Sequence, residues 1–292
     1  MSYICIEYPL KDIRKKDFFI NRTYIIILQQ KIEIKPMNKN HLRTLVPTAI
    51  FIASQIVSGV LAGLMLLLID DTDSSATSSA MSGTLVVGDV IALSLLMLTK
   101  HINFKTAFRP SSAVSASTAY AIAGAATGIF ATNIFSDLIT LPDAMEATFM
   151  QLKDSILGIA SIAIIGPVTE EFIFRQATLG GMLRNGIRPI YAVLLSALIF
   201  GIIHFNWAQI LPAFFIGIML GIIYLKTGNI ILCTIIHIIN NSIAVAQMIV
   251  LGENTKDFKL TDALGGYTLA IPLMVACFAL SAFLLVKLWR RE

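Results

Sequence analysis

The sequence predicts an all-α membrane protein, a polytopic bundle of about eight transmembrane helices. Hydrophobic residues make up 56% of the 292 residues and charged residues only 14%, whereas soluble domains carry about 25% charged residues. The mean hydropathy is +0.79. Long apolar runs without alternation exclude a closed β-barrel, so helices are the way for this chain to cross a bilayer.

Each predicted span approaches the roughly 20 apolar residues that a helix needs to cross about 30 Å of hydrocarbon. The second span is the shortest of them. The eight predicted spans are 45–69, 84–99, 112–135, 155–183, 190–206, 210–226, 229–250 and 268–288.

Basic and acidic connections alternate along the chain, which predicts its orientation. The acidic connections are 70–83 and 136–154, and the basic positions include Arg43, Lys100, Lys105, Arg109, Arg184, Arg188 and Lys226. Because positive loops stay in the cytoplasm, both termini are expected there, and the expected location is a bacterial plasma membrane. Nine of the 22 Lys and Arg residues fall within positions 1–44 and the others gather at helix ends, so the net charge of +4 does not indicate nucleic-acid binding.

Four regions follow from this pattern. Residues 1–44 form a basic tail, expected to be disordered or to reflect an over-extended start before Met37. Residues 45–150 hold the first three spans and carry no motif. Residues 151–250 hold the polar residues of interest and form the predicted catalytic core, and residues 251–292 supply a loop and the last span.

Glu170, Glu171 and Arg175 lie inside an apolar span, where each charge costs roughly 2.5–3.5 kcal/mol on insertion scales. Glu171 and Arg175 have the i,i+4 spacing of a helical ion pair. Glu170 points about 100° away from Glu171, so it is free to face a wet cavity. The reverse assignment, with Glu171 as the reactive carboxylate, stays open.

Two further spans each present a polar row. Phe200 and His204 are one turn apart, and His237 is followed one turn later by Asn241, with Asn240 beside it. At 1.5 Å per residue, Glu170 and His204 each lie about 21 Å, and His237 about 12 Å, from one end of its helix. All three can therefore meet around one buried cavity. Asp89, by contrast, is expected near the outer interface, hydrated and not catalytic.

These side chains suit amide hydrolysis without a covalent intermediate. A carboxylate beside an imidazole can take a proton from water, and an imidazole and a carboxamide on one helix face can stabilise an oxyanion. Glu170, His204 and His237 could instead bind zinc as two histidines and a carboxylate. The chain has no His-Glu-x-x-His helix, so no cofactor is expected and zinc is the less favoured mechanism.

The motifs resemble those of the CPBP family, which comprises the CAAX proteases and the bacteriocin-processing or Abi proteins. The family motifs are a glutamate pair followed after three residues by arginine (Glu170, Glu171, Arg175), then Phe-x-x-x-His (Phe200, His204) and His-x-x-x-Asn (His237, Asn241). The similarity covers about 155–245. Gln176 departs from the pattern, since family members often have Gly after the arginine.

The resemblance implies a role for each of these residues. Glu170 would activate water with help from His204, His237 and Asn241 would bind the oxyanion, and Glu171 and Arg175 would support the site. Phe200 is expected to pack, and Asn240 to join helices.

The expected function is an intramembrane glutamate-type endopeptidase. Its partners would be the lipid bilayer and a peptide substrate, such as a prenylated CAAX end or a bacteriocin-related peptide, reaching the cavity from the cytoplasm or from lipid. A non-enzymatic immunity, transport or scaffold protein is the alternative. The sequence leaves the oligomeric state open.

Overall fold

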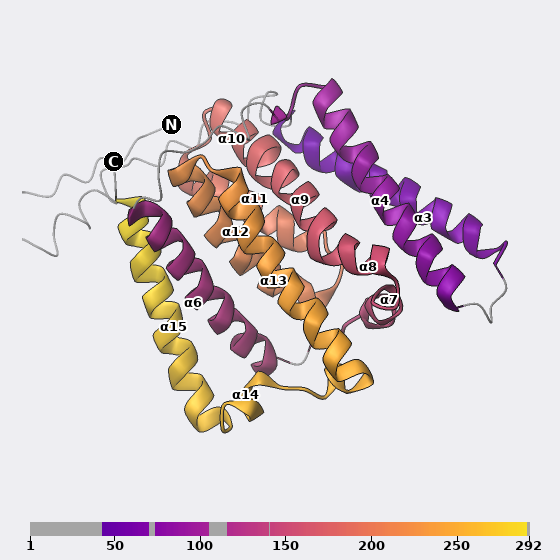
Figure 1. Ribbon diagram of the computed structural model, residues 1–292. Helices are drawn as coiled ribbons and strands as arrows, with labels where there is room; N and C mark the ends of the chain where they lie inside the picture. The colour runs from indigo at the N-terminus through magenta and orange to yellow at the C-terminus, as the bar shows by residue number, and fades with distance from the viewer. Residues whose placement is uncertain (1–42, 70–73, 105–115, 140, 291–292) are drawn as a thin grey trace, which may run out of the picture. The chain divides into compact units, whose positions relative to one another are not determined.

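The computed structural model describes residues 43–69, 74–104, 116–139 and 141–290. Every regular element in these ranges is helical (Figure 1), which confirms the predicted fold class. Most of the predicted basic tail, up to residue 42, lies outside the described residues, as do the acidic positions 70–73 and the basic positions Lys105 and Arg109.

The first two spans form a hairpin. A short 3-10 turn, η1 (Arg43–Leu45), leads into α3 (Val46–Leu66), and α4 (Ser74–Leu98) returns beside it. Small residues let the two backbones approach closely: the Ser58 hydroxyl donates a 2.5 Å hydrogen bond to the Thr84 carbonyl. Close contact through small side chains is a common way for helices to associate in lipid.

The central span runs from Ile156 to Arg184 over 29 residues and changes helix type along its length. After the short helix α7 (Glu146–Leu152), its elements are α8 (Ile156–Ala160), the π-helical η2 (Ser161–Ile165), α9 (Gly166–Glu171), the π-helical η3 (Phe172–Leu179) and α10 (Gly180–Arg184). Pro167 has no backbone N–H to give to the helix, and it lies two residues after the end of the first π-helical segment. The glutamate pair thus lies between two wide turns, a helix type that is frequent at functional sites.

The next two helices, α11 (Pro189–Ile202) and α12 (Trp207–Thr227), form a second hairpin. They touch at Gly217, where an added Cβ would lie 3.0 Å from Ala197. Gly228 ends α12 with a φ of 61°, a conformation that favours glycine. Asn229 then caps α13 (Ile230–Leu251) by accepting a hydrogen bond from the Leu232 N–H.

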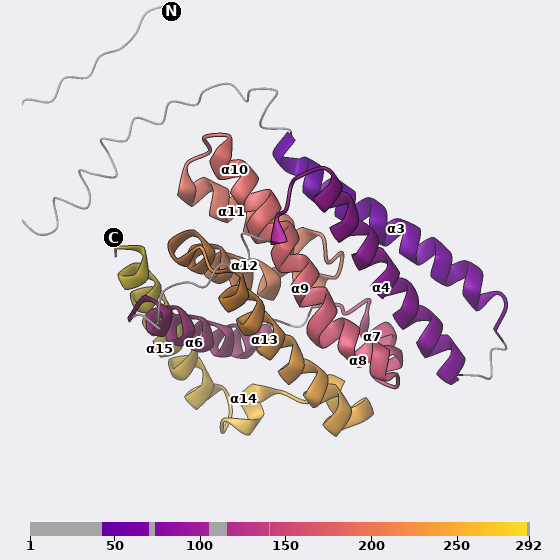
Figure 2. The same cartoon turned by 45° about the horizontal axis from the view of Figure 1, so that its top comes forward.

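The remaining long helices, α6 (Ala116–Leu138) and α15 (Tyr267–Trp289), lie side by side (Figures 1 and 2). The Ser281 hydroxyl of α15 donates to the Gly124 carbonyl of α6 at 2.7 Å. Two short elements, η4 (Gly252–Lys256) and α14 (Leu260–Ala263), connect α13 to α15.

Seven described helices are long and apolar enough to cross a membrane, so the protein is an integral membrane protein. The predicted fifth span differs from the prediction: α11 has 14 residues, or about 21 Å of helix, and is shorter than a full crossing. The predicted second span is longer than expected, since α4 begins at Ser74 instead of residue 84 and has 25 residues. The Ser/Thr-rich stretch before residue 84, which reads as a loop, is the polar first part of this helix.

The described charged residues differ in sign between the two ends of the bundle; Figure 1 shows which helix ends lie together at each end. The described basic residues at one end, with no described Asp or Glu among them, are Arg43, Lys100, Arg184, Arg188, Lys226, Lys287 and Arg290. The other end carries Asp137, Asp143, Glu146, Asp154, Glu253, Asp257 and Asp262 with Lys153, Lys256 and Lys259. We refer to these as the basic end and the acidic end. At the basic end, partial burial and the nearby Arg184 guanidinium lower the pKa of His101.

Candidate active site

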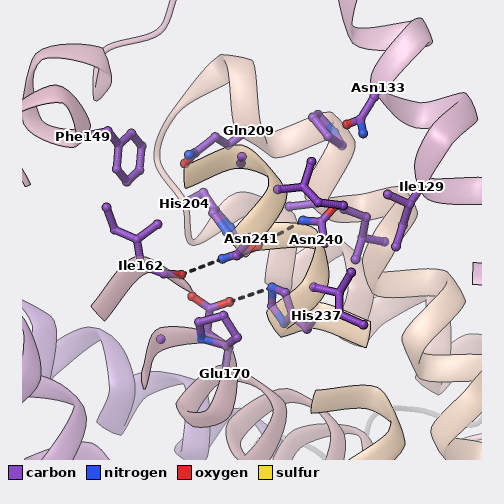
Figure 3. A pocket seen from close by; sticks show the side chains of 18 of the residues that line it. Ile129, Asn133, Phe149, Ile162, Glu170, His204, Gln209, His237, Asn240 and Asn241 are labelled. Carbon is purple, nitrogen blue, oxygen red and sulfur yellow. Dashed lines mark hydrogen bonds and ion pairs between the residues drawn. The ribbon is translucent and has the colours of Figure 1, made fainter. Parts of the chain in front are cut away.

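A cavity of about 1080 Å³ lies among the helices and reaches residues of the acidic end. Side chains from α3, α4, α6, α9, α11, α12 and α13 line it. The predicted site residues that line it are Glu170, Phe200, His204, His237, Asn240 and Asn241. Figure 3 shows Glu170, His204, His237 and Asn241 gathered around one space. The three motifs, up to 71 positions apart in the sequence, therefore meet at this cavity.

Glu170 presents its carboxylate to the cavity at the middle of the central span. Its side chain is 19% exposed, and its Oε2 lies 3.7 Å from the His237 Nε2 (Figure 3). That distance is longer than a hydrogen bond and is typical of a pair that shares a water molecule or faces a substrate group. A carboxylate in this position can receive a proton from a water held beside the imidazole.

The other nitrogen of the same imidazole contacts the second glutamate. His237 Nδ1 lies 2.9 Å from Glu171 Oε1, so the ring donates its Nδ1–H to that carboxylate. A histidine fixed in this way keeps one ring orientation. His237 therefore lies next to both Glu170 and Glu171, although the two glutamates point about 100° apart on their helix. The oxyanion role that the resemblance implies for His237 with Asn241 stays a prediction.

Glu171 and Arg175 form the predicted i,i+4 ion pair behind the cavity. Arg175 Nε lies 3.0 Å from Glu171 Oε2, and both side chains are fully buried. The two atoms are close but not aligned as a hydrogen bond, so charge attraction is the main contact between them. The guanidinium also lies 4.9 Å from the centre of the Phe200 ring, a cation–π distance.

Phe200 packs at the base of the site, as expected, and borders the cavity. Its ring makes edge contacts with His204 at 5.0 Å and with His237 at 5.8 Å between ring centres. Phe174 lies 5.1 Å from Phe200. Phe200 thus contacts both the buried Arg175 guanidinium and the two imidazoles of the cavity.

His204 follows the end of α11 and reaches the cavity from the side opposite the central span (Figure 3). Its Nδ1 lies 2.8 Å from the Phe200 carbonyl, which can only accept, so Nδ1 carries the proton and Nε2 is left for the cavity. Among the described contacts, Glu170 forms its imidazole pair with His237 and none with His204. His204 and Glu170 line the same cavity, as the sequence predicts, and the assisting role of His204 stays a prediction.

Asn240 and Asn241 form a short chain of amide hydrogen bonds. Asn240 Nδ2 donates to Asn241 Oδ1 at 3.0 Å, and Asn241 Nδ2 donates to the Ile162 carbonyl at 3.0 Å (Figure 3). A carboxamide has two N–H donors, so one donor of Asn241 remains available. The bond to Ile162 joins α13 to the π-helical η2 of the central span.

Asp89 is the functional candidate that sequence reasoning missed. It is 7% exposed, accepts a 2.9 Å hydrogen bond from Gln55 Nε2, and lines the cavity together with Gln55. The expectation of a hydrated residue at the outer interface is wrong, because α4 begins at Ser74 and places Asp89 well inside the helix. The signal was present in the sequence, since an ionisable residue within a span is by default a functional candidate.

Gln176, the departure from the family pattern, joins the central span to the segment after α4. Its Oε1 accepts from the Asn103 N–H at 2.9 Å and its Nε2 donates to the Asn103 carbonyl at 3.1 Å. The residue is thus structural and lies away from the cavity lining.

A zinc site would need three protein ligands around one point. In the part of the chain that the structure describes, no group of three His, Cys, Asp or Glu side chains is arranged to hold a metal ion. Glu170, His204 and His237, the suggested zinc ligands, share the cavity without forming such a group.

Comparison with known proteins supports the motif assignment. Residues 152–243 match the family model for type II CAAX prenyl endopeptidase Rce1-like proteins. No curated protein and no solved structure matches the chain. The matched segment contains all three motifs and every element from the end of α7 to the middle of α13. Over about a third of its length the chain therefore resembles the Rce1-like CAAX endopeptidases, which supports an intramembrane endopeptidase and confirms the predicted relationship.

Proposed function

We propose that the protein is an intramembrane glutamate-type endopeptidase in which Glu170 activates a water molecule. The observation that supports this most directly is the position of the Glu170 carboxylate, partly exposed in a cavity at mid-span and 3.7 Å from an imidazole that is itself fixed by a buried carboxylate. A carboxylate in this position can contact a bound water molecule, and the fixed His237 ring lies beside that water.

In the proposed reaction the water oxygen attacks the peptide carbonyl carbon while Glu170 takes one of its protons. The carbonyl oxygen becomes an oxyanion, and the free N–H of Asn241 and the cavity-facing nitrogen of protonated His237 donate to it. The C–N bond then breaks as Glu170 passes the proton that it took from the water to the leaving amine nitrogen. His204, with its Nε2 toward the cavity, orients the water or this nitrogen.

Each remaining polar residue has a positioning role in this scheme. Glu171 and Arg175 hold the His237 ring through the contact at Nδ1. Asn240 and the Ile162 carbonyl hold the amide of Asn241. Because these partners are buried or helix-bound, the donors are aimed before substrate arrives, which is how such groups lower a barrier.

We also infer the orientation of the cavity in the membrane. The cavity reaches Asp137 and Asp143 of the acidic end, whereas the described positive charge gathers at the basic end. The positive-inside rule then places both termini in the cytoplasm and the cavity opening on the opposite face. This differs from the cytoplasmic approach considered from the sequence, and the plasma membrane remains the predicted location.

The experiment that tests the activity is cleavage of a peptide panel, with prenylated CAAX peptides included, by purified protein in lipid. Glu170→Gln keeps the size of the side chain and removes its basicity, so we expect turnover to fall by about 10²–10⁴ with an unchanged melting temperature. Mass spectrometry reads the cleaved bond. A chelator-treated sample runs in parallel, since loss of activity together with stoichiometric zinc would favour the metal mechanism.

Full activity of the Glu170→Gln variant would exclude Glu170 as the base. Cleavage by Glu170→Gln but not by Glu171→Gln would favour the reverse assignment. If cells that carry either substitution keep the immunity or transport that the wild-type protein provides, that result would favour the non-enzymatic alternative.

A further inference from the structure

The cavity is lined by acids and by no described Lys or Arg. Its charged lining residues are Asp89, Asp137, Asp143 and Glu170. Arg175 is the Lys or Arg closest in sequence to Glu170, and it is fully buried and already paired with Glu171. Only the imidazoles of His204 and His237 can add positive charge to the lining. Walls of one charge sign around a low-dielectric cleft concentrate ligands of the opposite sign.

Asp89 is the residue of this lining whose carboxylate is both buried and fixed by a neighbouring side chain. It is more than nine-tenths buried, and the structure gives one of its oxygens, Oδ1, a hydrogen bond from Gln55. Its second oxygen has no hydrogen-bond donor among the described residues. Asp89 and Gln55 both belong to the cavity lining. A buried carboxylate with one oxygen that lacks a donor matches a cationic group that carries several N–H donors.

The mouth of the cavity continues the same charge. Asp143 accepts a 2.8 Å hydrogen bond from Asn206 Nδ2, and Asp137 accepts a 2.9 Å bond from the Thr261 N–H. Both carboxylates are thereby fixed in place at the acidic end. A cation that approaches from this side meets negative charge at the mouth and again at Asp89, beside the proposed base.

We propose that the cavity binds a basic peptide and that Asp89, held by Gln55, pairs with a Lys or Arg side chain of it. The assignment rests on the proposed function in one respect: the pairing places a neighbouring peptide bond of the substrate at Glu170. The substrate is therefore an apolar peptide segment with a positive charge close to the cleavage site.

The test measures binding apart from hydrolysis. Three fluorescent peptides of one apolar sequence carry Lys, norleucine or Glu at a single central position, and each is titrated against the Glu170→Gln protein in nanodiscs. A buried charge-assisted hydrogen bond favours the Lys peptide by about tenfold or more over the norleucine peptide, and the Glu peptide binds most weakly. Adding Asp89→Asn abolishes the Lys preference and leaves the norleucine affinity unchanged.

Asp262→Asn is the matched control, because Asp262 is an exposed acid of the same end that does not line the cavity. It should keep the full Lys preference. Equal affinity of the three peptides overturns the proposal without any variant of Asp89, and a Lys preference that survives Asp89→Asn overturns the assignment to Asp89. If Asp89→Asn does not fold, Asp89→Glu must still prefer Lys.

Cleavage of the same peptides by the wild-type protein separates this proposal from the proposed function. A Lys preference in binding without hydrolysis by the wild type supports the cationic site and contradicts the peptidase. Hydrolysis of all three peptides at equal rates with equal affinities supports the peptidase and contradicts the cationic site.

Discussion

The two ring nitrogens of His237 face two adjacent glutamates. Its Nδ1 contacts Glu171 at 2.9 Å and its Nε2 faces Glu170 at 3.7 Å. Neighbouring helix positions point about 100° apart, and the His237 imidazole lies between the side chains of the two glutamates. Glu171 thus orients the ring from the protein interior, while Glu170 faces it in the cavity and is the carboxylate that we propose as the base.

The buried group of Glu171, Arg175 and His237 should be strongly coupled in stability. Removing one partner of a buried ion pair leaves an uncompensated charge and costs about 3–5 kcal/mol. We therefore expect Arg175→Met and Glu171→Gln each to lower the free energy of unfolding by about that amount, and the double variant to lose less than the sum.

Chemical unfolding of the four proteins in detergent measures this cycle. Asp154→Asn is a suitable control, since its pair with Lys153 is 61% exposed on the Asp154 side and such pairs contribute little. Additive losses would show that Glu171 and Arg175 act independently.

The residues of the site could be named from the sequence, but their contacts could not. The i,i+4 spacing of Glu171 and Arg175 depends only on helix geometry, so that pair was predictable. The contact of His237 with both glutamates depends on how α13 packs against the central span, which no local spacing specifies. Asp89 was missed because its depth depends on where α4 begins, and polar residues such as Ser74 and Ser75 hide that start.

At the scale of elements, the α11–α12 hairpin positions His204. Gly201 lies three residues before it, and a Cβ added there would meet the Ile210 carbonyl oxygen at 2.6 Å. A backbone atom cannot move aside as a side chain can, so Gly201→Ala must separate the two helices. We expect a loss of about 1–3 kcal/mol in stability and a lower kcat, because the end of α11 and with it His204 shifts.

Melting temperature and kcat of Gly201→Ala, measured beside Gly63→Ala, test this expectation. An added Cβ at Gly63 meets nothing within 4 Å, so that control should be neutral or slightly stabilising in a helix. Equal behaviour of the two variants would contradict the role given to the close contact at Gly201.

Element boundaries were predicted well where breakers mark them and poorly elsewhere. Gly228 and Asn229 mark the turn between α12 and α13, and the structure has a left-handed glycine and an N-cap there. The π-helical turns on both sides of the glutamate pair have no such marker. Pro167 lies between the two π-helical segments and Arg175 lies within the second, but no local residue pattern specifies the wider turns.

At the scale of the whole molecule, the segregation of charge predicts the side from which the cavity is reached. In a background without native cysteines, we expect a single cysteine at position 146 to react with a membrane-impermeant maleimide in intact cells. A cysteine at position 188 should react only after permeabilisation, because Glu146 belongs to the acidic end and Arg188 to the basic end. The reverse labelling pattern would place the opening in the cytoplasm.

The depth of Glu170 has an electrical consequence. It lies 14 residues from each end of the 29-residue central span, about 21 Å from either end, and therefore near the midpoint of the transmembrane voltage. One elementary charge that crosses the whole membrane changes energy by about 2.3 kcal/mol per 100 mV. A cationic side chain that enters from the outer face as far as Glu170 and Asp89 crosses about half of that drop, roughly 1 kcal/mol per 100 mV. An energised, inside-negative membrane would thus draw such a peptide into the cavity, and collapse of the voltage would weaken its binding several-fold.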